Sequence, residues 1–312
     1  MLVKQIRSEA PRVVTLTLTD PGGGALPHWE PGAHIELVLP SGAIRQYSLC
    51  GDDQDKASYR IAVLHEGEGR GGSREVHTTA LVGKDLAVRG PHNHFALGPA
   101  ERYLLVAGGI GVTPILAMAR GLERTGKAWR AVYCGHSGSM ALSDELSAVN
   151  ADRVTIVETD KQGRPDLAAL IDGAAPGTAV YVCGPAPLIA AVRQLCEEAH
   201  PPLPVRCERF AADPAARPAD PTGDGPFEVE MARSGTTVTV AAGQTILDAV
   251  REVCPGVPFS CEEGYCGTCE TRVLDGVPDH RDDVLSAVEH ERSATMMICV
   301  GRSKTPRLTL DI

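Results

Sequence analysis

The 312-residue chain has few aromatic residues, no excess of basic residues and no long uninterrupted apolar segment. Phenylalanine, tryptophan and tyrosine make up 4% of it, and no arginine-rich stretch is interleaved with them. The formal net charge is −10. Because phosphate binding depends on clustered lysine and arginine, these features argue against nucleic acid as a partner.

The longest apolar run, residues 103–119, is broken by three glycines and a proline. A membrane-spanning helix needs about 20 predominantly apolar residues, so no membrane segment is predicted. Residues 1–5 have neither the basic start nor the apolar core of a signal peptide. We therefore expect a cytoplasmic protein without a membrane partner. No Ser-His-Asp or paired-carboxylate constellation stands out either.

Cysteine is abundant, and its placement is informative. Of the ten cysteines, six are scattered singly and four share one C-terminal segment. A disulfide scaffold is normally a short secreted chain, whereas clustered cysteines in a long unexported chain more often bind a metal or an iron–sulfur cluster.

Three regions differ in their sequence pattern, which predicts a multidomain fold. Residues 1–98 alternate apolar and polar positions between Gly/Pro turns, as in a small antiparallel β-barrel or sandwich. Residues 99–211 alternate apolar runs with helical segments, which indicates a doubly wound α/β domain. Residues 212–225 form a Pro-rich linker, and residues 226–312 form a small α+β domain. Expected strands are 13–18, 35–39, 59–64, 103–107, 130–134, 154–158, 179–183, 227–231, 236–240 and 307–312, and expected helices are 115–125, 143–149, 166–171, 187–199 and 246–253.

The strongest motif is the cysteine segment CEEGYCGTC, which begins at residue 261, with a further cysteine about thirty residues on. This is the plant-type C-x4-C-x2-C…C spacing that ligates a [2Fe–2S] cluster. The alternative is a four-cysteine zinc site, but zinc usually takes two C-x2-C pairs. The predicted ligands are Cys261, Cys266, Cys269 and Cys299.

Two further motifs lie in the α/β domain. The segment GGIGVTP, from Gly108, follows a buried strand and opens a helix, where glycines allow the backbone to approach a pyrophosphate. The segment YVCGP, from Tyr181, ends the last apolar strand of this domain. Both motifs fall at carboxyl ends of strands, where ligands of open α/β sheets bind.

The barrel domain contributes RQYS, from Arg45, and GRGGS, from Gly69. Each is weak alone. Together they place arginine, hydroxyl groups and a Gly-Gly turn in one small domain, a set that suits a phosphate and a planar cofactor.

In this order, RQYS, GRGGS, GGIGVTP, YVCGP and CEEGYCGTC…C resemble the phthalate dioxygenase reductase family, which includes vanillate O-demethylase reductases. The resemblance covers essentially the whole chain. It implies a flavin-binding β-barrel, an α/β NAD domain of the ferredoxin–NADP reductase type and a C-terminal plant-type ferredoxin domain. The implied activity is electron transfer from NADH through FMN and [2Fe–2S] to a separate Rieske oxygenase.

The same resemblance implies roles for individual residues. Cys183 would lie beside the nicotinamide, and Phe210, in the segment Glu208-Arg209-Phe210, would shield the flavin ring. Cys207 and Gly301 depart from the family pattern, where an aromatic residue and a serine are usual. Implied flavin contacts are Arg45, Tyr47, Ser48, Gly71, Gly72 and Ser73, and implied NADH contacts are Gly109, Gly111, Thr113, Pro114, Gly184 and Pro185.

NADH is favoured over NADPH because the loop with His136 and Ser137, where the adenine ribose should lie, carries no arginine. From Pro226 onward there are 14 acidic and 8 basic residues, a charge that could steer the chain toward a basic patch on a transiently bound oxygenase. We expect a monomer. The acids Asp275, Asp279, Asp282 and Asp283 are expected to stabilise a loop rather than bind a second metal.

Two other classes of function remain open. A redox sensor would use the cluster to report oxidation state and would turn over poorly with NADH. A permanently bound electron-transfer subunit would expose a sizeable apolar patch.

Overall fold

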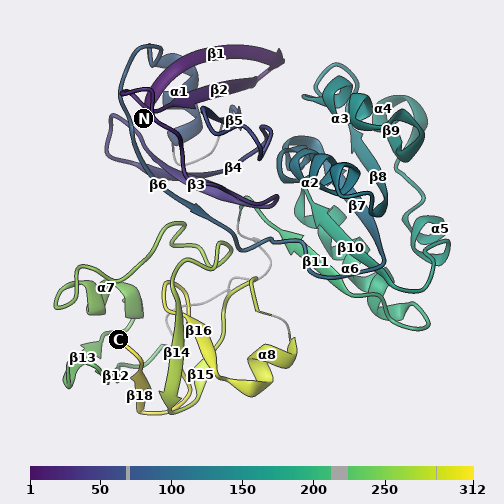
Figure 1. Cartoon of the computed structure of the whole chain (residues 1–312). Coiled ribbons are helices and arrows are strands. Elements are labelled where there is room, and N and C mark those ends of the chain that lie inside the picture. The colour runs from purple at the N-terminus through teal and green to yellow at the C-terminus, as the bar shows by residue number, and fades with distance from the viewer. Residues whose placement is uncertain (68–70, 212–223, 286) are drawn as a thin grey trace. The chain divides into compact units, whose positions relative to one another are not determined.

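Six antiparallel strands from the first 92 residues form two three-stranded sheets, ordered β1–β2–β5 and β4–β3–β6 (Figure 1). Their inward-facing apolar side chains, together with Val76 of helix α1, form one core, as expected of a barrel. The elements are β1 (Leu2–Ala10), β2 (Val13–Thr19), β3 (His34–Val38), β4 (Ile44–Ser48), β5 (Ser58–Leu64), α1 (Gly72–Thr78) and β6 (Ala87–His92).

The next region is a parallel five-stranded sheet in the order β11–β10–β7–β8–β9. Alternate residues of β7 point to opposite faces: Leu105 packs with α2 and α3, whereas Leu104 packs with α5 and α6. Helices on both faces define a doubly wound fold. The elements are β7 (Arg102–Gly108), α2 (Val112–Arg124), β8 (Ala128–Gly135), α3 (Ser143–Val149), β9 (Val154–Glu158), α4 (Thr159–Gln162), α5 (Leu167–Asp172), β10 (Thr178–Cys183), α6 (Ala186–Glu198) and β11 (Val205–Glu208), with 3-10 turns at Gly109–Gly111 and Ala151–Arg153.

The C-terminal region is a mixed five-stranded sheet, ordered β13–β12–β18–β14–β16, with the short pair β15–β17 beside it. Helix α7 packs its apolar residues into the core of this sheet. The elements are β12 (Phe227–Met231), β13 (Thr236–Val240), α7 (Ile246–Arg251), β14 (Glu270–Asp275), β15 (Pro278–Asp279), α8 (Ala287–Arg292), β16 (Thr295–Met297), β17 (Arg302–Ser303) and β18 (Arg307–Leu310).

This computed structural model describes residues 1–67, 71–211, 224–285 and 287–312. By its internal contacts the chain divides into unit 1, Met1–Glu208, and unit 2, Arg209–Ile312. Most of the predicted linker, residues 212–223, lies outside the described residues. None of the helices in the described ranges is long and apolar enough to cross a membrane.

Unit 1 joins the barrel and the α/β sheet through a common core and partly buried polar contacts. Arg60 of the barrel and Arg120 of α2 both pair with Glu145 of α3, with N–O distances of 2.5 and 2.7 Å. Arg120 also donates to the carbonyl of Cys50 at 2.9 Å. These contacts hold the two halves of unit 1 together, so sites formed between them have a defined geometry.

Candidate electron-transfer sites

Strand β4 carries the predicted flavin residues Arg45, Tyr47 and Ser48. Residues 45 and 47 share one face of the strand, because successive side chains alternate. Burial raises the pKa of Tyr47 to about 12, against the opposing effect of the nearby Arg45 charge. Tyr47 therefore remains a neutral phenol at physiological pH.

The second flavin motif lies directly against the first. Helix α1 begins after Gly71, whose φ of 83° is in the left-handed region. At Gly72 a Cβ atom would lie 2.6 Å from Nε of Arg45, so the guanidinium stem packs on the helix start. Ser73 accepts a hydrogen bond from the amide of Glu66 at 3.0 Å. Glycine, guanidinium and hydroxyl groups thus meet at one place, which fits a phosphate; Gly69 and Arg70 of the same motif lie outside the described residues.

The two nucleotide motifs of the α/β sheet also contact each other. A Cβ atom at Gly111 would overlap the carbonyl of Cys183 and the amide nitrogen of Gly184. At Gly108 it would overlap Pro185 and Leu188. The glycines are needed here because the turn after β7 passes close to the turn after β10. The close backbone approach at these strand ends is the geometry that a dinucleotide requires.

Within the first turn of α2, Thr113 and Pro114 are buried. The Thr113 hydroxyl donates to the carbonyl of Ile110 at 3.0 Å, so it stabilises the turn. Gly109 has a φ of 53°, and a Cβ atom added there would have no neighbour within 4 Å among the described residues. Direct contact of these three residues with NADH stays a prediction.

A polar cluster joins the barrel to the end of the α/β sheet. Ser48 donates to a carboxylate oxygen of Glu208 at 3.0 Å, across 160 residues of sequence. Glu208 lies on β11 in register with Cys183 on β10. The barrel strand that carries the flavin motif thus meets the strand end that carries the nicotinamide motif.

Burial shifts the ionisation of this cluster. It raises the pKa of Glu208 to about 8, although the hydrogen bond from Ser48 favours the ionised carboxylate. It also raises the pKa of the Cys183 thiol well above its usual value, and the neighbouring Glu208 adds to that effect. Cys183 is therefore a protonated thiol, and Glu208 changes charge near pH 8. The sequence pointed to Glu208 without indicating its role, because the pairing of β11 with β10 that places it beside Cys183 is not visible in the sequence.

At the end of β8, the predicted ribose loop contacts an acid from another element. Asp160 of α4 accepts hydrogen bonds from the Ser137 amide at 2.7 Å and from the Ser137 hydroxyl at 2.5 Å. These bonds lower the pKa of Asp160 to about 2. A fixed negative charge therefore lies beside His136 and Ser137. Sequence analysis missed Asp160, which is 23 residues from Ser137.

In unit 2, the four predicted cluster ligands come together. The sulfur of Cys261 contacts those of Cys266 and Cys299, and Cys299 also contacts Cys269. Hydrogen bonds from these thiols, and from the amides of Glu263 and Tyr265, lower the pKa of Cys261. Each of the four sulfurs thus neighbours at least one other, which fits a site for a sulfur-ligated metal cluster.

Glycines shape the loop around these sulfurs. Gly264 and Gly267 have φ values of 77° and 80°. At Gly264 a Cβ atom would overlap the side chain of Val300, next to Cys299. At Gly301, one of the departures from the family pattern, it would overlap Met296. It would also lie 2.9 Å from the carbonyl oxygen of Met297, which is backbone and cannot rotate away, so this close approach explains the glycine at 301.

Phe210 is 39% exposed and is the second residue of unit 2. Its proposed role over the flavin remains a prediction. Cys207, the other departure, lies on β11 opposite Val182.

Comparison with known proteins extends these observations. Residues 229–304 match the 2Fe-2S iron-sulfur cluster binding domain family, and residues 93–201 match the N-terminal domain of dimethylamine monooxygenase subunit DmmA-like proteins. The phenoxybenzoate dioxygenase subunit beta of Ectopseudomonas oleovorans is 45% identical over 96% of this chain and 93% of its own length.

The solved structures that match the whole chain include the following two. The phthalate dioxygenase reductase described as a modular structure for electron transfer from pyridine nucleotides to [2Fe-2S] has a TM-score of 0.71 and 35% identity, covering 97% of that chain. An intact type IV self-sufficient cytochrome P450 monooxygenase has a TM-score of 0.90 and 41% identity, but this chain spans only 40% of it. The fold, the four neighbouring cysteines and these matches together show that the chain belongs to the phthalate dioxygenase reductase family of oxidoreductases, which combine flavin, pyridine nucleotide and [2Fe–2S] sites in one polypeptide.

Proposed function

We propose that this chain is the reductase component of a Rieske-type oxygenase system. It would take electrons from NADH, pass them through FMN to the [2Fe–2S] cluster and deliver them to a separate terminal oxygenase. The observation that carries the proposal is the meeting of Ser48, Cys183 and Glu208, which joins the flavin motif to the nicotinamide motif. A flavin when bound accepts two electrons as a hydride and releases them singly, which a one-electron cluster requires.

The residues of unit 1 would bind and orient the two cofactors. Arg45, packed on Gly72, offers positive charge to the FMN phosphate, and Tyr47 offers a neutral ring surface. Cys183 offers a small, uncharged surface to the nicotinamide. Ser48 and Glu208 hold a proton at the junction, because the Glu208 carboxyl with its pKa of about 8 is mostly protonated at neutral pH. Positioning of this kind, rather than acid–base catalysis of bond cleavage, is what hydride transfer needs.

The charge at the ribose loop supports NADH as the donor. Asp160, held by Ser137, would repel a 2′-phosphate and suits a free ribose hydroxyl. FMN is preferred to FAD on the family resemblance.

A terminal oxygenase is the proposed partner, and binding would be transient and electrostatic, with the chain itself a monomer. Relatives carry the names of dioxygenase, monooxygenase and O-demethylase components. None of the ten cysteines forms a disulfide, which suits the reducing cytoplasm. A haem oxygenase is the second candidate acceptor, because the matched cytochrome P450 and a haem-dependent N-demethylase beta subunit share this architecture.

An anaerobic NADH titration of the purified holoprotein tests the proposal. We expect bleaching of the flavin absorbance together with a rhombic [2Fe–2S] signal in low-temperature EPR. In Cys266→Ser the flavin should still bleach while the EPR signal is lost. Flavin bleaching without an EPR signal in the wild type would contradict the cluster assignment. Absence of bleaching with both NADH and NADPH would favour a redox sensor, and co-purification in a fixed complex would favour a permanent subunit.

A further inference from the structure

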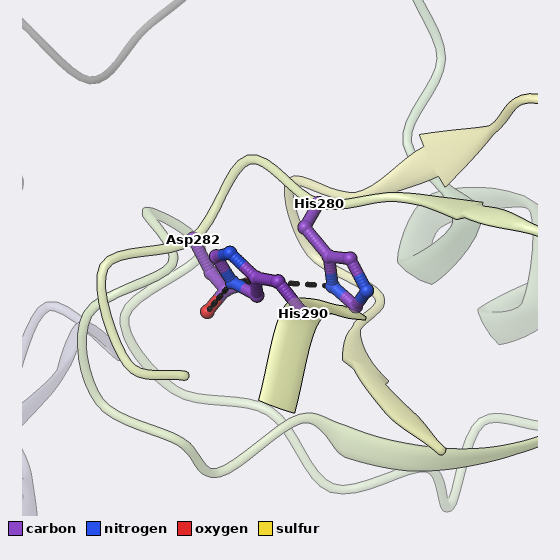
Figure 2. A group of neighbouring side chains, drawn as sticks. All are labelled: His280, Asp282 and His290. Atoms are coloured by element: carbon purple, nitrogen blue, oxygen red, sulfur yellow. Dashed lines mark hydrogen bonds and ion pairs between the residues drawn. The ribbon is translucent and has the colours of Figure 1, made fainter. Parts of the chain in front are cut away.

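Three side chains of unit 2 that the electron-transfer sites do not use converge in the loop after β15 and on α8. His280 and Asp282 lie on the loop, and His290 lies on the helix. One ligand atom from each lies within 4.8 Å of the other two. Figure 2 shows the carboxylate and the two imidazole rings gathered together, with dashed lines marking their contacts.

Three polar atoms of this group are buried and lack hydrogen-bond partners among the described residues. The side chains of His280 and Asp282 are 7% and 1% exposed. Both ring nitrogens of His280 and one carboxylate oxygen, Oδ1 of Asp282, have no hydrogen-bond partner. Buried polar atoms are almost always hydrogen-bonded, so three such atoms in one place require an ordered water or a bound ion.

The two oxygens of Asp282 have different surroundings. Oδ2 accepts hydrogen bonds from the amides of Val284 at 3.2 Å and Leu285 at 2.9 Å. These two hydrogen bonds agree with the expected loop-stabilising role of Asp282, and they fix the orientation of its carboxylate. Oδ1 faces Nδ1 of His280 at 3.7 Å, and Nε2 of His290 lies 3.4 Å from both oxygens, with a hydrogen bond to Oδ2.

These separations approach those of metal ligands. In a tetrahedral site with bonds of about 2.0–2.1 Å, ligand atoms lie about 3.3 Å apart. The two imidazole rings are stacked, with centroids 4.4 Å apart and planes inclined by 17°. His290 is 31% exposed, which leaves a path for an ion to enter.

The surrounding charges are compatible with a cation. Arg281 points to Asp224 and Asp279, with N–O distances of 2.6 and 2.8 Å, so its charge is already balanced. Of the other charges that act on His280, Lys304 disfavours a positive charge there, whereas Asp279 and Asp282 favour one.

We propose that His280, Asp282 and His290 form a second metal site, for a divalent transition-metal ion such as Zn²⁺. Two imidazoles and one carboxylate are ligands that suit Zn²⁺ and its neighbours rather than Ca²⁺ or Mg²⁺. A fourth position would be open to water, because three protein ligands converge here among the residues that the structure describes.

The site borders the loop of the cluster cysteines. The amide of Asp283, next to Asp282, donates to the carbonyl of Gly264 at 3.0 Å. An ion bound at Asp282 would therefore fix the segment that supports the loop between Cys261 and Cys266. The ion is inferred to stabilise the cluster loop.

Zn²⁺ titration by calorimetry on the chelator-treated holoprotein tests the site. We expect one high-affinity Zn²⁺ per chain, with the cluster absorbance unchanged. His290→Ala and Asp282→Asn should each raise the dissociation constant at least about tenfold, as removal of metal-supporting groups does. Asparagine keeps an oxygen for the Val284 and Leu285 amides, so this variant retains the turn. His28→Ala, an exposed histidine in unit 1, is the control.

Equal Zn²⁺ binding in wild type and His290→Ala would overturn the site, as would no binding at all. Binding that bleaches the cluster would also overturn it, because the ion would then be replacing iron at the cysteines. The stabilising role has its own readout, the rate of thermal bleaching of the cluster. Saturating Zn²⁺ should slow it by about threefold or more in the wild type and not in His290→Ala. Binding without slower bleaching would retain the site and refute its effect on the cluster loop.

Discussion

Glu208 is the single residue whose ionisation is most informative for unit 1. Its pKa of about 8 exceeds the ordinary value of 4.5 because the carboxyl is buried. The folded state therefore favours the protonated acid. The contribution of this group to stability is complete below about pH 4.5 and is lost as the pH rises through about 8.

Replacing Glu208 by glutamine should remove this pH dependence while keeping an acceptor for Ser48. Between pH 6 and pH 9 we expect the melting temperature of unit 1 to fall more in the wild type than in Glu208→Gln. The difference should be several degrees, since 1 kcal/mol corresponds to about 2–4 °C in a unit of this size. Calorimetry of the holoprotein measures it, with Glu197→Gln on the exposed face of α6 as control. Parallel curves for the wild type and Glu208→Gln would refute the assignment.

Asp160 should set the preference for the nicotinamide cofactor. Asp160→Asn keeps an oxygen for the Ser137 hydrogen bonds and removes the negative charge. Because the carboxylate is exposed, the effect should be modest: the ratio of kcat/KM for NADH to that for NADPH should fall by about 3–10-fold. Steady-state kinetics with both cofactors gives this ratio. Asp152→Asn, at the other end of β9, should leave it unchanged.

Gly72 tests the predicted flavin phosphate site. Alanine is a better helix former than glycine, so Gly72→Ala should not weaken α1 itself. Its Cβ atom would displace Arg45, however, because Nε lies 2.6 Å from the Cβ position. Loss of a charged hydrogen bond of about 1.5–3 kcal/mol should raise the FMN dissociation constant at least about tenfold.

Flavin fluorescence during dilution measures that constant. Gly67→Ala is the matched control, since no atom of the described part of the chain lies within 4 Å of its Cβ position. An unchanged FMN affinity in Gly72→Ala would mean that Arg45 does not hold the phosphate. The cluster EPR signal should persist in both variants.

Site residues that lie close together in the sequence could be predicted from it. Site residues that are brought together by strand register or by the position of a helix could not. The four cysteines lie close together because three of them share a nine-residue loop and Cys299 packs beside it. Glu208 and Asp160, by contrast, reach their partners only through the pairing of β11 with β10 and the position of α4 after β9.

At the scale of elements, the turns after β7 and β10 are mutually dependent. Gly111→Ala would place a Cβ atom on the carbonyl of Cys183, which is backbone and cannot rotate away. Overpacking of this kind costs about 1–3 kcal/mol or more. We therefore expect unit 1 to melt at least about 3–6 °C lower and to bind NADH more weakly.

Calorimetry and NADH titration check this result, and Gly51→Ala is the control. Its Cβ atom would make an ordinary contact, 3.4 Å from Cβ of Arg60. If Gly111→Ala had the same melting temperature as Gly51→Ala, the inferred close approach of the two turns would be refuted.

The expected elements that bury a regular apolar pattern are confirmed, and several agree to the residue. Strands β9, β12 and β13 and helix α3 begin and end as predicted. Elements outside those predictions are mostly short or polar: α1, α4, α8, β15 and β17 have two to seven residues. They form because neighbouring segments position them, as the side chain of Arg45 packs against α1, and such contacts leave no periodic pattern in the sequence.

For the whole molecule, the sequence predicts three domains, whereas the internal contacts divide the chain into two units. The prediction depends on sequence pattern, and the units depend on packing. The barrel and the α/β sheet differ in sequence pattern, yet Val13, Cys50 and Phe95 of the barrel region share a core with α2 and β7. A change in sequence pattern marks the point where one architecture gives way to another. A shared hydrophobic core, by contrast, joins two architectures into one compact unit. The domain boundaries at residues 98 and 211 therefore stay predictions.

The acidic charge of the C-terminal region should affect which acceptor proteins the molecule reduces. The segment from Pro226 onward carries 14 acidic and 8 basic residues, so it should attract a basic acceptor protein over long range. Raising the ionic strength from about 10 mM to about 150 mM shortens the Debye length from about 30 Å to about 8 Å. The bimolecular rate of NADH-driven reduction of cytochrome c, a basic protein, should then fall several-fold. Reduction of ferricyanide, a small anion, should not slow, because repulsion is screened instead. If both acceptors slowed equally, the effect would lie in NADH or flavin binding, and the acidic surface would have no role in choosing the partner.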